Sequence, residues 1–254
     1  MKGFFWRKLS VVPALLTILW AGSGHAEETL MVGVLADNPP MVFRDADTKF
    51  VGYDVDVLQE VGRRIGKTMQ FKVINWDQKT EELNGKQIDV IASGLSITEE
   101  RKKIYAFTDP VVQKYTQMLI VNTASPIKAR DDLGGKTVCV MEGASAGELV
   151  QDFRSASGQT AKVQTAPTME GCLIQLTAGE TDSAVMDGVT CEYYIKHNPG
   201  QFRIVPGALS KRQTAFALRL EDRALLGTFN DALKAMEADG TMKRLRERWL
   251  GDIN

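Results

Sequence analysis

The chain has 254 residues, of which 44% are hydrophobic, and its 31 lysines and arginines nearly balance its 32 aspartates and glutamates. This composition is typical of a globular protein and excludes the collagen-like, fibrous and disordered classes. The formal charge of −1 gives no electrostatic basis for binding nucleic acid. The apolar stretches fall short of the roughly 20 residues that a membrane-spanning helix needs.

The first 26 residues have the parts of a secretory signal peptide. A basic start precedes a mostly apolar stretch over 9–21, and small residues occupy the end at 24–26. We expect cleavage after Ala26. The first cysteine beyond that point is Cys139, so a lipid anchor on an N-terminal cysteine is unavailable. We therefore expect an unanchored protein in a Gram-negative periplasm.

The first half of the mature chain alternates strand and helix patterns. Asp54 is a candidate N-cap for a helix that carries Val57, Leu58, Val61 and Ile65 on one face. A second helix is expected to begin near Thr98. The expected strands are 29–35, 70–74, 88–92 and 117–122.

The same alternation then restarts. The expected strands are 136–141, 162–164, 183–186 and 216–218. The expected helices are 145–153, 169–178, one that ends near residue 196, and two final helices separated by Gly240.

This order predicts an α/β protein with mainly parallel sheets in two lobes, joined by connections that are themselves strands. In such sheets ligands bind beyond the carboxyl ends of the strands. The residues at those ends are 35–38, 93–96, 141–145 and 186–187. These segments are therefore the candidate site.

Arg101 is the first candidate binding residue. Thr98 suits an N-cap, and Glu99 and Glu100 suit the first helical turn, but a cation at the third helical position is mildly unfavourable. The planar guanidinium binds a carboxylate through two parallel hydrogen bonds. Ser96 and nearby backbone N–H groups could add donors. The alternative is a surface arginine, free in solvent or paired with a neighbouring glutamate.

The segment from Val140 to Glu148 predicts a strand, a glycine turn and a helix. Ser145 and Glu148 form an S-x-x-E capping box, and the turn offers N–H groups to an anion. The segment also matches G-x-S-x-G, the hydrolase nucleophile elbow, with Asp187 and His197 following in triad order. We give that reading little weight because the cap already explains Ser145. His197 also stands about 15 Å along the helix from Asp187, at ~1.5 Å per residue.

Two further residues have open roles. Asp187 directly follows an expected strand, so its carboxylate could accept hydrogen bonds from an ammonium group or could cap the next helix. Trp76 could stack on the apolar part of a ligand or fill the core. The cysteines lack C-x-x-C spacing, and one mature histidine does not build a zinc site with them, so no metal or cofactor is indicated.

Together these segments resemble the polar amino-acid-binding proteins of bacterial ABC importers, which have the type II periplasmic binding fold. The resemblance covers essentially the whole mature chain. Its motifs are Gly52-Tyr53-Asp54-Val55-Asp56, Lys86-Gln87-Ile88-Asp89 with Ser96 through Arg101, Phe107-Thr108-Asp109-Pro110, Asp131 through Lys136, Asp187, and Asp239-Gly240-Thr241 with Trp249. Val111 departs from the family pattern, which has an aromatic residue there.

The resemblance implies a function and a site. Arg101 would bind the α-carboxylate of an amino acid with help from Ser96 and the backbone N–H of Ser145, and Asp187 and the Gly94 carbonyl would bind the α-ammonium. Trp76 would cover the side chain. The full expected set is Trp76, Ser93, Gly94, Ser96, Arg101, Met141, Ser145 and Asp187. The closed, liganded monomer would deliver its cargo to a membrane permease.

The resemblance also implies details of domain organisation and specificity. One lobe would comprise 27–113 and 214–254, and the other 114–213. Leu35, Met141 and Met186 stand where relatives for charged or polar ligands carry polar groups, so we expect a ligand with an uncharged side chain. An enzyme on the same fold, either dehydratase-like or a Ser145 hydrolase, and a periplasmic sensor are the alternatives.

The three cysteines allow one internal disulfide with one cysteine left over. The residues alone leave the pairing open. Some glutamate- and glutamine-binding relatives pair a strand cysteine with one on a helix of the same lobe. That resemblance implies a bond between Cys139 and Cys172 and a free Cys191.

Overall fold

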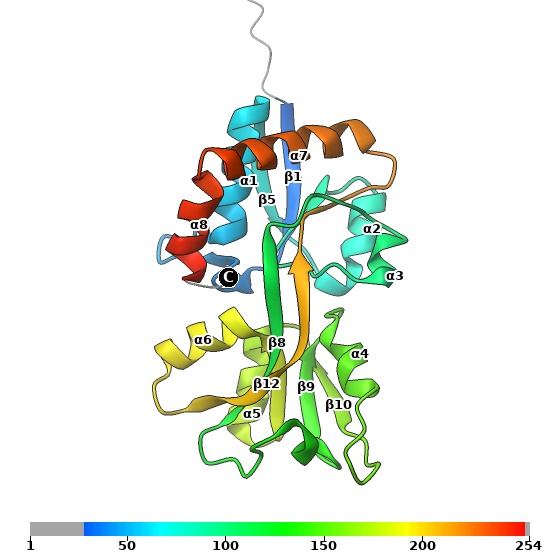
Figure 1. Ribbon diagram of the computed structural model, residues 1–254, viewed down its shortest axis with the longest axis vertical. Coiled ribbons are helices and arrows are strands. Elements are labelled where there is room, and N and C mark those ends of the chain that lie inside the picture. Colours follow the sequence, from blue (N-terminus) through cyan, green and yellow to red (C-terminus); the bar gives the residue numbers. More distant parts are fainter. Residues whose placement is uncertain (1–27, 252–254) are drawn as a thin grey trace, which may run out of the picture.

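The structure is a computed structural model that describes residues 28–251, and it has two lobes joined by a pair of long strands (Figure 1). Lobe 1 is built on the sheet β5-β1-β6-β13-β7, and lobe 2 on the sheet β10-β9-β11-β8-β12. The expected signal peptide at 1–26 lies outside the described residues. Within 28–251, no helix is long and apolar enough to span a bilayer.

Lobe 1 takes its sheet from both ends of the described chain. Its strands are β1 (Glu28–Val34), β5 (Lys67–Val73), β6 (Val90–Ile91), β7 (Ala106–Phe107) and β13 (Ala217–Leu218). A small antiparallel sheet precedes the first helix and comprises β2 (Asp37–Asn38), β3 (Val42–Arg44) and β4 (Phe50–Val51).

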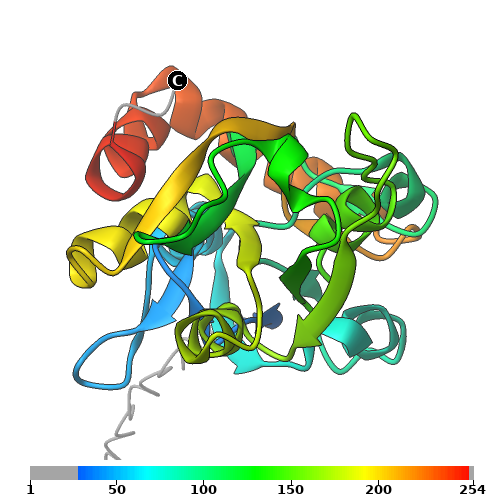
Figure 2. The ribbon, with the colours of Figure 1, turned by 90° about the horizontal axis from the view of Figure 1, so that it is seen from below.

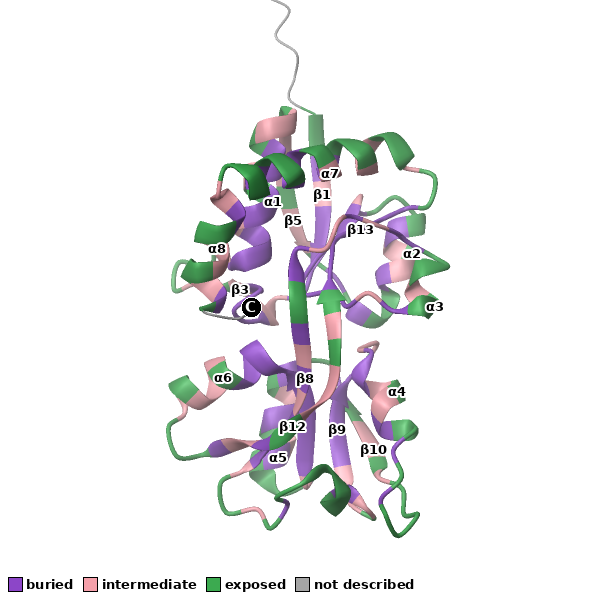
Figure 3. Cartoon of the chain, in the orientation of Figure 1, coloured by how far each residue is buried: buried purple, intermediate pink, exposed green. Residues whose placement is uncertain are grey.

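Helices α7 and α8 of lobe 1 bury one face and expose the other, as Figure 3 shows, and α8 packs against α1 and α7. The bounds of the lobe 1 helices are α1 (Tyr53–Ile65), α2 (Lys79–Asn84), α3 (Glu99–Lys102), α7 (Arg223–Ala238) and α8 (Thr241–Leu250), with a 3₁₀ turn η1 (Trp76–Gln78) before α2. The expected apolar face of α1 is confirmed at Val57, Leu58 and Val61, which are fully buried. A left-handed Gly66 ends this helix.

Lobe 2 holds the middle of the chain. Its strands are β8 (Val112–Asn122), β9 (Thr137–Met141), β10 (Lys162–Ala166), β11 (Ser183–Asp187) and β12 (Phe202–Thr214). Its helices are α4 (Ala146–Gln151), α5 (Met169–Ala178) and α6 (Gly188–His197), with a 3₁₀ turn η2 (Arg130–Leu133). Figures 1 and 2 show α4 and α6 on opposite sides of this lobe.

Strands β8 and β12 connect the lobes as an antiparallel ribbon, with Phe202 paired to Asn122 at one end and Thr214 to Val112 at the other. The expectation that the connections are strands is therefore confirmed. The expected lobe boundaries at 113/114 and 213/214 fall inside this ribbon and stay a prediction. Each sheet is mainly parallel, as expected, with one antiparallel strand: β13 runs against β6 and β7 in lobe 1, and β8 runs against β11 and β12 in lobe 2.

The apolar core has a part in each lobe and a part between them. One cluster lies within lobe 2, and a larger one lies mostly under the helices of lobe 1. A third cluster joins Leu35 and Trp76 of lobe 1 to Met141 and Met186 of lobe 2. Because buried side chains of both lobes touch there, the two lobes are closed on each other.

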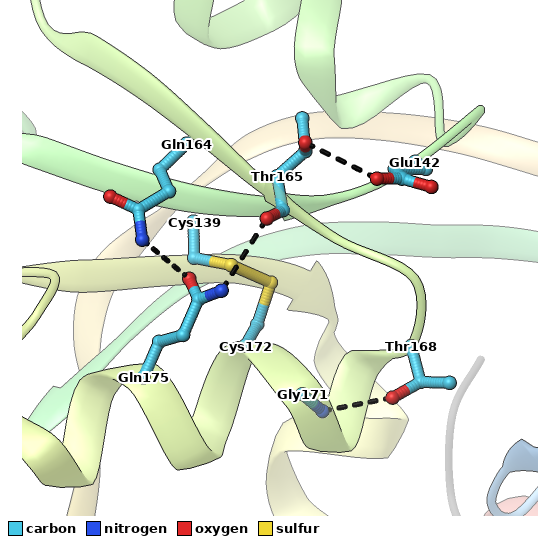
Figure 4. The surroundings of a disulfide bond; sticks show 8 residues. All are labelled: Cys139, Glu142, Gln164, Thr165, Thr168, Gly171, Cys172 and Gln175. Carbon is cyan, nitrogen blue, oxygen red and sulfur yellow. Dashed lines mark hydrogen bonds between the residues drawn. A yellow bond between two sulfur atoms is a disulfide. The ribbon is translucent and has the colours of Figure 1, made fainter.

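A disulfide joins Cys139 on β9 to Cys172 on α5, as expected (Figure 4). Both cysteines are buried, and Cys191 is free and buried. Two polar contacts flank the bond: the Gln175 side chain donates to the Thr165 carbonyl, and Thr168 caps α5 by accepting the Gly171 N–H at 2.9 Å. The disulfide therefore ties α5 to β9, beside a hydrogen bond that ties α5 to the neighbouring strand β10.

Candidate functional site

A narrow pocket lies between the lobes, and all eight residues expected at the site line it. Seven further residues also line it, and these are Leu35, Gln117, Ala144, Ala146, Met169, Val185 and Met186. The free cavity is about 30 Å³, which is room for roughly two water molecules. A ligand of several non-hydrogen atoms therefore enters only when the lobes separate.

Arg101 reaches the pocket from lobe 1, and helix α3 sets its position. Thr98 caps that helix, as expected, by accepting the Arg101 N–H at 3.2 Å. The guanidinium donates to the Ser96 carbonyl at 3.0 Å and, across the cleft, to the Gly143 carbonyl at 3.2 Å. Burial lowers the pKa of Arg101 from its ordinary value, but the group stays charged at neutral pH. The reading of Arg101 as a surface arginine paired with a glutamate does not match this geometry.

Lys79 is a buried cation beside the partly buried Arg101, and sequence reasoning missed it. Its ammonium donates to the Trp76 carbonyl at 2.9 Å and to the Gly143 carbonyl at 3.2 Å. Burial, followed by the charge of Arg101, lowers the pKa of Lys79 to about 8. Two cations of lobe 1 thus share one carbonyl of lobe 2. No sequence motif around Lys79 signals this contact.

Asp187 supplies a buried carboxylate from lobe 2, at the carboxyl end of β11. It occupies the N-cap position of α6, but its side chain makes no capping hydrogen bond. Burial raises the pKa of Asp187 to about 7, and the charge of Arg101 partly opposes that shift. A buried carboxylate of this kind is stabilised in its charged form by a cation brought into the pocket.

Ser145 does not form the capping box that the sequence predicts. It has helical dihedral angles, φ −68° and ψ −8°, whereas a capping side chain needs an extended backbone. Its hydroxyl instead accepts from the Gln117 amide at 3.2 Å, and the Gln117 oxygen accepts from Ser210 at 3.2 Å. Gln117 is therefore a pocket residue that sequence reasoning missed, since it is brought to the site by β8.

The hydrolase arrangement is absent from the described residues. His197 contacts the Tyr193 carbonyl at 2.8 Å through its Nδ1 and stacks on the Tyr193 ring, and it does not line the pocket that holds Ser145. The described part of the chain also contains no group of histidine, cysteine and carboxylate side chains that could hold a metal ion. The pocket therefore offers binding groups without a serine–histidine pair.

Asp54 is not an N-cap, contrary to the sequence interpretation. Helix α1 begins two residues earlier than expected, with Gly52 as its N-cap, and Asp54 points inward. One of its carboxylate oxygens accepts from the backbone N–H of Ser93 at 2.9 Å and of Gly94 at 2.7 Å. Burial raises the pKa of Asp54 to about 7. Asp54 thus holds a turn that lines the pocket.

The remaining wall of the pocket is apolar. Trp76 both lines the pocket and packs in the cluster between the lobes, so the two roles considered for it coexist. Its neighbours on this wall are Leu35, Met141, Met169 and Met186. This wall presents no charge to the side chain of a ligand.

Comparisons with known proteins agree with this architecture. A family model described as bacterial extracellular solute-binding proteins, family 3, matches residues 30–252. The L-cystine-binding protein TcyJ of Escherichia coli (strain K12) is 30% identical over 224 residues, which cover 88% of this chain and 83% of that protein. A probable amino-acid ABC transporter-binding protein of Haemophilus influenzae is 30% identical over 260 residues, which cover 96% of this chain and 98% of that protein.

The fold is also similar to solved structures. An ancestral arginine-binding protein bound to glutamine has a TM-score of 0.83 and 33% sequence identity, with coverage of 90% of this chain and 100% of that chain. Both the sequence and the fold therefore match across nearly the whole described chain.

Proposed function

Because this chain belongs to the bacterial extracellular solute-binding proteins of family 3, we propose that its pocket captures an amino acid with an uncharged side chain. The family and the relatives named above are binding proteins rather than enzymes by their descriptions. TcyJ is described as an L-cystine-binding protein, and the solved relative is an ancestral arginine-binding protein bound to glutamine. These descriptions support an amino acid as the ligand, whereas the preference for an uncharged side chain rests on the apolar wall of the pocket.

The observation that carries the proposal is that Arg101 and Asp187 reach one pocket from opposite lobes. A zwitterion has a carboxylate and an ammonium at one end, and burying both needs a fixed counter-charge for each. Arg101 would bind the carboxylate, with Ser96 and the Ser145 backbone, and Asp187 would bind the ammonium with the Gly94 carbonyl. A ligand that touches both lobes favours the closed state through its differential affinity.

The apolar wall would select the side chain. Trp76, Met141 and Met186 offer dispersion contacts and no compensating charge. A lysine, arginine, aspartate or glutamate side chain buried there would lose hydration without a partner. We therefore expect an uncharged side chain to be preferred.

Delivery to an ABC permease completes the proposal. The Haemophilus relative is described as a probable amino-acid ABC transporter-binding protein, which supports a similar role here. We propose that the chain works as a monomer in the periplasm after removal of residues 1–26. N-terminal sequencing of the protein from a periplasmic extract should then begin at Glu27, and retention of the first 26 residues would contradict this part.

Isothermal titration calorimetry with the twenty L-amino acids and L-cystine tests the ligand class. The expected result is one binding site per chain for one or a few amino acids of this panel whose side chain is uncharged. Tight binding of lysine, arginine, aspartate or glutamate alone would reject the uncharged preference, and binding of none would reject the proposed function.

A further inference from the structure

A second zone of contact between the lobes lies where the small sheet of lobe 1 meets helix α6 of lobe 2. The Tyr194 hydroxyl donates to the Asp37 carboxylate at 2.9 Å, and the rings of Phe43 and Tyr193 lie 5.7 Å apart. Between these outer contacts, the Thr190 hydroxyl donates to the side-chain oxygen of Asn38 at 3.1 Å. None of these residues lines the pocket described above.

Asn38 uses both ends of its side chain. Its NH₂ group donates to the Ser93 carbonyl at 2.9 Å, while its oxygen accepts from Thr190. Asn38 and Thr190 are fully buried. Because a carbonyl only accepts, the contact with Ser93 fixes which end of the amide faces Thr190. One side chain therefore joins a pocket turn of lobe 1 to a helix of lobe 2.

The turn that Asn38 holds has an unfavourable backbone conformation. Ser93 has φ +86° and Gly94 has φ +66°, and the first value is rare for a residue with a side chain. Asp54 accepts both N–H groups of this turn, and the Ser93 hydroxyl accepts the Leu35 N–H at 3.0 Å. A Cβ atom on Gly94 would lie 2.6 Å from the Tyr115 hydroxyl oxygen. The surroundings thus impose the shape of the turn.

We propose that Asn38 is a positioning residue that holds the Ser93–Gly94 turn in its binding shape and couples that shape to lobe closure through Thr190. This inference rests on the proposed function, in which Gly94 contributes to ammonium binding. Separation of the lobes removes the Thr190 hydroxyl and leaves the Asn38 oxygen to water. Closure buries that oxygen again, so the closed state needs the Thr190 donor.

The variant Thr190→Val tests the coupling, because it removes the hydroxyl and keeps a β-branched side chain. The Asn38 oxygen is then buried without a donor only in the closed state, so affinity should fall by about fivefold to a hundredfold. The loss should appear as faster dissociation in stopped-flow measurements, with a smaller ligand-induced decrease in the radius of gyration by X-ray scattering. Thr190→Ser retains a hydroxyl and should recover most of the affinity.

Thr123→Val is the matched control. Thr123 lies in the same lobe, and its hydroxyl donates to the Gly200 carbonyl at 2.8 Å on an exposed surface. This variant should bind like the wild type. The Asn38→Ala and Thr190→Val substitutions should also be non-additive, with the double variant losing less than the sum of the single losses.

The probes are the twenty L-amino acids and L-cystine, and the tightest binder of the wild type is used for all variants. Absence of binding by the wild type rejects the proposed function and, with it, this inference. If the wild type binds and Thr190→Val releases the ligand at the same rate as the wild type, this inference is rejected and the proposed function is not. Loss of affinity in both the valine and serine variants also rejects it, because a retained hydroxyl should restore the contact.

Discussion

The two walls of the pocket use different chemistry. The lobe 1 wall presents the Arg101 guanidinium, held by the Ser96 and Gly143 carbonyls, next to a rigid turn at Ser93 and Gly94. The lobe 2 wall presents the Asp187 carboxylate among methionine side chains. Lobe 1 thus offers a cation with fixed hydrogen-bond geometry beside Leu35 and Trp76, whereas lobe 2 offers one buried carboxylate and an adaptable methionine surface. Affinity and selectivity should therefore respond differently to changes in the two walls.

The largest expected effect is loss of the lobe 1 cation. Arg101→Ala should weaken binding of an uncharged amino acid by about 2–5 kcal/mol, or about thirtyfold to several thousandfold, because the ligand carboxylate is buried unpaired. Arg101→Lys should lose less, since it keeps the charge without the two-pronged geometry. Calorimetry measures both. Lys102→Ala, an exposed position on the same helix, should bind normally; an equal loss there would contradict the assignment.

Removal of the disulfide should affect the lobe 2 wall. Cys139 and Cys172 are 33 residues apart, and replacing both by serine should lower the free energy of unfolding by about 3–4 kcal/mol in the chain-entropy model. The bond joins the elements that carry Met141 and Met169, so hydrogen exchange should increase in β9 and α5 before it does in lobe 1. Urea unfolding gives the total loss. A uniform increase across both lobes would contradict this localisation.

Acidity should weaken binding through Asp187. Burial raises its pKa to about 7 in the ligand-free protein, so a proton competes with the ligand ammonium below that pH. The dissociation constant should rise up to about tenfold per unit as the pH falls below 7. Titrations between pH 5 and 8 measure the slope.

Asp187→Asn is the control for this pH dependence. It should bind weakly with a flatter pH profile, and a profile as steep as that of the wild type would assign the proton to another group. The free energy of unfolding has the opposite pH dependence to the ligand affinity. Because the pKa of Asp187 is raised in the folded state, the folded protein keeps a proton that the unfolded chain releases. The wild type should therefore lose stability relative to Asp187→Asn as the pH rises from about 4 to 7.

The smallest expected effect is at Ser145. Ser145→Ala removes the acceptor for the Gln117 amide, a hydrogen bond within lobe 2, so the free energy of unfolding should fall by about 0.5–1.5 kcal/mol and the ligand affinity by at most about tenfold. The backbone of the turn stays available. A much larger loss in calorimetry would mean that the Ser145 hydroxyl itself binds the ligand.

All eight residues of the expected set line the pocket, because strand ends and spaced motifs both marked those segments, and their roles in ligand binding stay a prediction. Local patterns were less reliable for side-chain roles: Asp54 and Ser145 both match capping positions, but tertiary contacts with Ser93 and Gln117 determine where they point. The contact between Asn38 and Thr190 joins residues 152 positions apart. Such a contact depends on how the lobes meet, and no local pattern encodes it.

The position of β13 in the sheet has a consequence for the order in which the two lobes fold. This strand lies between β6 and β7, where Ala217 pairs with both Ile91 and Phe107. The central sheet of lobe 1 therefore remains interrupted until residues 217–218 have emerged, whereas the strands of lobe 2 are contiguous from Val112 to Thr214. A chain that emerges from its amino end can complete the second lobe first, and the lobe that starts the sequence is the last to close its sheet.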